Sequence, residues 1–83
     1  MTNTIEQIKT EYLYIKTDTD TAMQTDNKEC VSRNIDLLLG FNRALLAIAM
    51  TDLGDFGRQV LNIADEINRY TKIALDWHRE HLQ

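Results

Sequence analysis

The densest group of chemically versatile side chains lies at residues 76–81, which read Asp-Trp-His-Arg-Glu-His. His78 and His81 are three positions apart, so on a helix they share one face. A zinc site needs three or four ligands in fixed geometry, and two histidines do not supply them. We therefore expect no metal and no other cofactor. His81 is expected to half-fill a helix seam, and His78 is expected to lie in solvent.

The single cysteine offers a second kind of chemistry. Cys30 lies just after the expected start of a helix, and a helix N-terminus makes a thiol more reactive. A catalytic cysteine also needs a base within reach, and neither histidine is reliably placed beside it. We expect Cys30 to act as a small apolar residue at the start of that helix, and we expect no catalytic residue in the chain.

Two cations and an aromatic ring come together at Arg69, Tyr70 and Lys72, with Trp77 further along the same segment. Stacking on the rings and pairing with the cations could hold an anionic nucleotide between subunits. The alternative is structural: Tyr70 lies in a helix seam, and both cations lie in solvent and pair with nearby carboxylates. We favour the structural alternative and keep these four residues as candidate ligand contacts.

Asn42 and Arg43 interrupt the most apolar stretch of the chain, residues 35–50. A buried asparagine at a seam fixes the register or the oligomeric state of packed helices. A buried arginine is costly unless it reaches solvent or meets an acid from a neighbouring helix. We interpret the pair as a specificity device in a helical assembly. The stretch is too short and too interrupted to predict a membrane-spanning helix.

Composition narrows the classes of function. The 83 residues carry 9 Lys and Arg against 13 Asp and Glu, which argues against nucleic acid as the main partner. One cysteine excludes an intrachain disulfide, and the chain has no phosphate-binding glycine loop or other catalytic motif. No export signal is evident, so the expected compartment is the cytoplasm. These observations favour a binding protein over an enzyme.

Helical periodicity and the absence of proline predict an all-α chain. A short first helix is expected over residues 3–16, where one stripe contains Ile5, Ile8, Tyr12 and Ile15. Residues 17–25 begin with five alternating threonines and aspartates, which prefer caps and turns to helix interiors. This segment is therefore expected to be a linker and the least regular part of the interior of the chain.

Two longer helices are expected to follow. The second covers residues 27–50, begins at an Asp26 cap and is apolar on two faces, which is typical of a helix that is covered on two sides. Glycines and aspartates at 52–57 separate it from a third helix over residues 53–81, about 40 Å long. The third helix carries a heptad repeat formed by Phe56, Val60, Ile63, Ile67, Tyr70, Ala74, Trp77 and His81. The sequence thus predicts one domain, a small three-helix bundle or helical hairpin whose C-terminal helix is about twice the length of its N-terminal helix.

These helices leave more apolar surface than a chain of this size can cover. The excess is expected on the outer face of the second helix, where a homodimer or higher assembly would bury it. The candidate contact residues are Leu37, Phe41, Asn42, Arg43, Ala44 and Ile48. We hypothesise a non-enzymatic, acidic protein–protein interaction module, namely an inhibitor or regulatory accessory protein. The alternative is an oligomer that binds or sequesters an anionic nucleotide.

Overall fold

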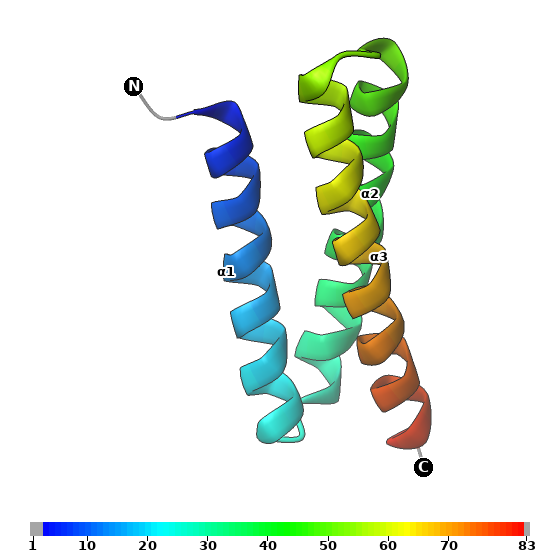
Figure 1. Ribbon diagram of the computed structural model, residues 1–83. Coiled ribbons are helices and arrows are strands. Elements are labelled where there is room, and N and C mark those ends of the chain that lie inside the picture. Colours follow the sequence, from blue (N-terminus) through cyan, green and yellow to red (C-terminus); the bar gives the residue numbers. More distant parts are fainter. Residues whose placement is uncertain (1–2, 83) are drawn as a thin grey trace.

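The computed structural model describes residues 3–82, which form three helices joined by short turns (Figure 1). They are α1 (Thr4–Gln24), α2 (Lys28–Thr51) and α3 (Asp55–Glu80). Each helix is antiparallel to the next, so α1 and α3 run in the same direction. This architecture confirms the predicted all-α three-helix bundle, with its longest helix at the C-terminal end.

The expectation of a linker over residues 17–25 is wrong, because α1 continues to Gln24. At 21 residues α1 is not half the length of α3, which has 26. The apolar stripe continues past Ile15 into two further buried residues, Thr19 and Ala22. The Thr19 hydroxyl donates a hydrogen bond to the Ile15 carbonyl at 2.7 Å, which satisfies it inside the helix. Burial of the stripe outweighs the low helix propensity of threonine and aspartate.

The end of α1 is a Schellman motif. The Asn27 N–H donates to the Ala22 carbonyl at 2.8 Å, and the Asp26 N–H donates to the Met23 carbonyl at 3.3 Å. Asp26 has a φ of 56°, in the left-handed region that aspartate tolerates better than most side chains. Asp26 therefore ends α1 and does not cap α2. The cap is Asn27, whose Oδ1 accepts the Cys30 N–H at 3.2 Å.

The turn between α2 and α3 brings two backbone segments into close contact. The Gly54 N–H donates to Asp52 Oδ1 at 2.8 Å, just before α3 begins. Gly57, in the first turn of α3, is buried, and a Cβ atom there would lie 1.7 Å from the Asp52 carbonyl oxygen. Only a residue without a side chain fits this position.

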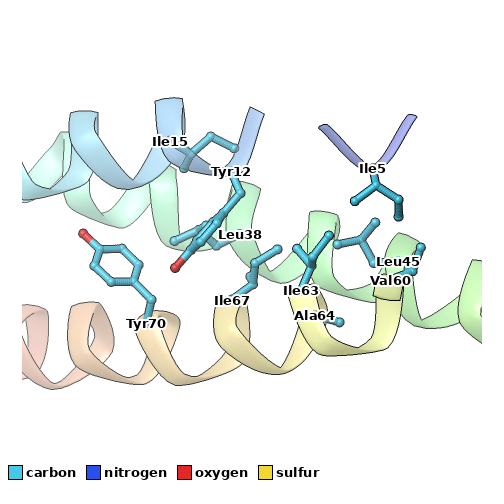
Figure 2. Close-up of a cluster of buried hydrophobic side chains, with 10 residues drawn as sticks. All are labelled: Ile5, Tyr12, Ile15, Leu38, Leu45, Val60, Ile63, Ala64, Ile67 and Tyr70. Carbon is cyan, nitrogen blue, oxygen red and sulfur yellow. The ribbon is translucent and has the colours of Figure 1, made fainter. Parts of the chain in front are cut away.

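α2 and α3 form a hairpin, and α1 lies along one side of it (Figure 1). Figure 2 shows side chains from all three helices converging in the core. This core consists of Ile5, Tyr12, Ile15, Leu38, Leu45, Val60, Ile63, Ala64, Ile67 and Tyr70. A second cluster is formed by Ala22, Val31, Ile35 and Ala74. The heptad repeat of α3 is confirmed as one seam of an unbroken helix, with Phe56 and Trp77 half-buried near its ends.

α2 is, among the helices within residues 3–82, the one long and apolar enough to cross a membrane by length and composition alone. That finding carries little weight, because the core helix of a soluble protein satisfies the same criterion. In this fold α2 buries five of its 24 residues, Val31, Asn34, Ile35, Leu38 and Leu45, and most of its apolar window is not buried.

Two core tyrosines differ in how their hydroxyls are satisfied. The rings of Tyr12 and Tyr70 meet edge to face, with centroids 6.3 Å apart. The Tyr70 hydroxyl donates to the Asp20 carboxylate and lies 3.1 Å from the Lys16 carbonyl oxygen. The Tyr12 hydroxyl is buried and has no hydrogen-bond partner within residues 3–82. Burial, reinforced by the charges of Glu66 and Asp20, raises the pKa of Tyr12 to about 12.

Removing the two hydroxyls should therefore change stability in opposite directions. We expect Tyr12→Phe to raise the free energy of unfolding by about 1 kcal/mol. The substitution deletes a hydroxyl that gives up its hydrogen bonds to water on folding and gains none in the core. We expect Tyr70→Phe to lower the free energy of unfolding by about 1–2 kcal/mol, because it deletes the hydrogen bond that the single hydroxyl proton donates to the Asp20 carboxylate of α1. Urea denaturation of both variants measures the difference. A destabilised Tyr12→Phe variant would show that its hydroxyl has a partner.

Candidate interaction surface

A polar cluster joins α1 to α2 near the turn between them. The Asn34 side-chain amide donates to Asp18 Oδ2 at 2.8 Å and to Thr19 Oγ1 at 3.0 Å. The Cys30 thiol also donates to Asp18 Oδ2, at 3.5 Å. Sequence reasoning missed this cluster. The available signal was the position of Asn34 in the buried stripe of α2, where an amide needs a partner.

Acid should weaken this cluster through Asp18. The hydrogen bond from Asn34, and then that from the Cys30 thiol, holds the pKa of Asp18 below its ordinary value. A lowered folded-state pKa stabilises the fold above the ordinary pKa, and this stabilisation disappears as pH falls through the folded-state pKa. We expect the melting temperature of the wild type to fall more steeply below about pH 4 than that of Asp18→Asn. Thermal melts from neutral to acidic pH measure this, and equal slopes would contradict it.

The predicted contact residues divide between two flanks of α2. Cys30 and Asn34 contact α1, and helical spacing carries the same stripe on through Leu37, Phe41, Ala44 and Ile48. That stripe therefore lies at the edge of α2 nearer to α1, and of its four residues Phe41 departs from the expected outward-facing position. Leu37, Ala44 and Ile48 remain exposed at this edge, whereas Phe41 packs against the core.

Because Phe41 packs against the core, the substitution Phe41→Asp cannot serve as a test of dimerisation. The dimer hypothesis expects Phe41→Asp to yield a monomer or an unfolded chain. Because Phe41 is partly buried against the core, a carboxylate there would be removed from water without gaining a hydrogen bond or an ion pair. The substitution is therefore expected to unfold the chain, and it does not separate an intermolecular contact from the core.

The candidate ligand contacts do not form one site. Arg69 pairs with Asp65 at 3.0 Å, and Tyr70 points into the core between α1 and α3 (Figure 2). Trp77 stacks on His81, with ring centroids 4.1 Å apart, next to the second cluster. The hollow that contains Arg69 and Tyr70 also contains Lys16 and Glu66, but neither Lys72 nor Trp77.

The histidines and the cysteine each have different partners. His81 Nδ1 lies 2.8 Å from the Trp77 carbonyl oxygen, and His78 lines a shallow hollow with Leu82 near the start of α2. The Cys30 thiol is engaged with Asp18. Within the part of the chain that the structure describes, no group of three His, Cys, Asp or Glu side chains could hold a metal ion.

The hairpin has a second broad surface, on the side where α1 is absent. Three shallow hollows lie there, and residues of α2 and the α3 segment alone line them. We call this surface the uncovered face. Its large exposed apolar side chains include Leu39, Leu46, Met50 and Leu61, which are 46%, 38%, 80% and 49% exposed.

Asn42 and Arg43, which were expected near an oligomer contact, both line a hollow on the uncovered face. Asn42 lines two of the hollows, and its buried Oδ1 has no hydrogen-bond partner within residues 3–82. Arg43 is exposed beside Gly40 and Ala47. The face thus combines exposed apolar side chains with small residues and a charged group.

Comparison with known proteins found no match among family models, curated proteins or solved structures. The uncovered face is therefore interpreted from its own residues.

Proposed function

We propose that this chain is a non-enzymatic protein–protein interaction module of the inhibitor or regulatory accessory type, acting in the cytoplasm. The observation that carries the proposal is the uncovered face of the α2–α3 hairpin. Soluble monomers rarely expose contiguous apolar patches of more than a few hundred Å² without a binding role. Here Leu39, Leu46 and Met50 follow one another along a single flank of α2, with Leu61 of α3 beside them.

The charge of the chain supports the same class of function. The net charge is −4, and the exposed acidic side chains would steer the protein toward a basic region of a partner. The apolar side chains of the uncovered face would then supply the buried centre of the contact, with the charged residues around it as a polar rim.

Two matched variants on α2 test the proposal. Leu39 and Leu37 are exposed to similar degrees, two residues apart, on opposite flanks of the same helix. The wild type and each variant are immobilised and exposed to a lysate of the source cells. We expect Leu39→Glu to fail to capture the proteins that the wild type captures. Leu37→Glu should retain them, since it carries the same charge beside α1. Equal retention by both variants would show that the uncovered face is not the binding surface.

The anionic-nucleotide alternative stays a prediction with weaker support. Lys16, Arg69 and Tyr70 line one hollow, but the Glu66 carboxylate lies in the same hollow and Asp65 already neutralises Arg69. A carboxylate at the site opposes phosphate binding by charge repulsion. Stabilisation of the protein by millimolar nucleotide in a thermal-shift assay would favour this alternative.

A further inference from the structure

We infer that the uncovered face binds a second copy of this chain, with the two α2 helices antiparallel about a two-fold axis between Leu39 and Gly40. The inference rests on the proposed function and names a second copy of the chain as the occupant of that same surface. Because each copy carries a net charge of −4, this contact depends on local pairs of opposite charge and not on steering by net charge. In such a dimer α2 and α3 of both copies form a four-helix bundle, and each α1 lies on the outside.

The first observation is a pair of opposite charges on the uncovered face of α2. Asp36 and Arg43 are both exposed, and each lines a hollow on this face. They are seven residues apart, which is two helical turns, so they point in the same direction about 10 Å apart along the helix. Neither takes part in an ion pair within residues 3–82.

A two-fold axis placed midway between the two charges makes the surface complementary to itself. In an antiparallel pair of α2 helices that cross between Leu39 and Gly40, Asp36 of each copy lies level with Arg43 of the other. The same ion pair then forms twice. A symmetric dimer needs this kind of self-complementary surface, in which each residue of a contacting pair is supplied by both copies.

The residues near the axis allow the helices to approach. A Cβ atom at Gly40 would have no atom within 4 Å, so the backbone there faces open space. Helices pack most closely where their contact residues are small. Leu39 lies next to the axis and would meet its own equivalent. Because the copies are antiparallel, the apolar residues Leu46 and Leu61 would lie near the level of Leu75 of the second copy.

The same charges argue against insertion of this face into the hydrocarbon core of a membrane. α2 is long enough to cross a membrane, but Asp36 and Arg43 share the face with its exposed leucines. A charged side chain at the centre of a bilayer is strongly unfavourable. In the dimer each of these charges meets its opposite.

A charge swap tests the register. The mass of the wild type in solution should be twice that of the 9.6 kDa chain, and its dimer dissociation constant can be measured by analytical ultracentrifugation. Arg43→Glu and Asp36→Arg should each weaken the dimer by about tenfold or more, since each places like charges opposite one another twice. The double variant Asp36→Arg, Arg43→Glu should return to within about threefold of the wild type, because it restores both pairs with their signs exchanged. Lys9→Glu, the same charge change on α1, should leave the dissociation constant unchanged.

A cross-link provides a second measurement that does not depend on charge. In a Cys30→Ser background, Leu39→Cys should form an intermolecular disulfide on mild oxidation, and Leu37→Cys should not. A wild type that stays monomeric at hundreds of micromolar, or a double variant that fails to recover, would overturn the inference. Monomeric protein that floats with phosphatidylcholine–phosphatidylglycerol vesicles would overturn it in favour of a membrane. If, in any of these cases, Leu39→Glu still abolishes the capture of proteins that the wild type retains, the result would support the proposed function. It would also show that only the identity of the partner is wrong.

Discussion

Replacing Gly57 by alanine should lower the free energy of unfolding by about 2–3 kcal/mol or more, which is the upper range for overpacked sites. The added Cβ would lie 1.7 Å from the Asp52 carbonyl oxygen and 2.8 Å from the Asp52 carbonyl carbon. Both are backbone atoms, so no side chain can rotate out of the way. The first turn of α3 would have to move away from the end of α2. Urea denaturation at equilibrium measures the loss.

Gly54 provides a matched control three residues away. An alanine Cβ there would meet Asp52 Oδ1 at 3.3 Å, and this atom is the end of a side chain that can rotate. We expect Gly54→Ala to lower the free energy of unfolding by less than about 1 kcal/mol. Similar losses in the two variants would show that contact with the backbone at Gly57 is not the cause.

Truncating Leu38 to alanine should have a comparable effect, a loss of about 3–4 kcal/mol, for a different reason. Leu38 is fully buried where α2 faces both α1 and α3 (Figure 2). Its loss leaves a cavity between three helices, none of which can close it alone. Leu37→Ala is the control, because its side chain is half-exposed and its loss should lower stability by less than about 1 kcal/mol. Chemical denaturation compares the two, and equal losses would contradict the placement of the core.

The seams of the fold could be predicted because they repeat. The spacing of Phe56, Val60 and the residues that follow continues over more than three heptads, and no other element of secondary structure satisfies that period. The glycines and aspartates at residues 52–57 marked the turn between α2 and α3, because these residue types favour the ends of helices. These signals are sufficient for a three-helix bundle.

The end of α1 could not be predicted from local propensity. Threonine and aspartate disfavour helices in isolation, but Thr19 is buried against α2 and hydrogen-bonded to Asn34. That partner lies 15 positions away in the sequence. Asp26 also resembled an N-cap, although its left-handed backbone places it just after the end of α1.

The candidate surface was predicted in part. Asn42 and Arg43 stood out because polar residues rarely interrupt an apolar helix, and both lie on the uncovered face. In the stripe of Leu37, Phe41, Ala44 and Ile48, the expected outward-facing position is wrong for Phe41, which packs against the core. Periodicity shows which residues of a helix form its apolar surface. The position of α1 against α2 decides which of those residues stay exposed. Polar contacts between Asp18, Asn34 and Cys30 fix that docking.

The hydrogen bond between Tyr70 and Asp20 bears on the order in which the molecule folds. It joins residues 50 positions apart, whereas short turns connect each helix to the next one. Chains dominated by such near-neighbour pairing collapse quickly, and a distant contact closes a large loop only after its anchors exist. We therefore expect neighbouring helices to pair first and the contact between α1 and α3 to close last. Openings that separate α1 from α3 would then expose Tyr70 and Asp20 without unfolding the helices.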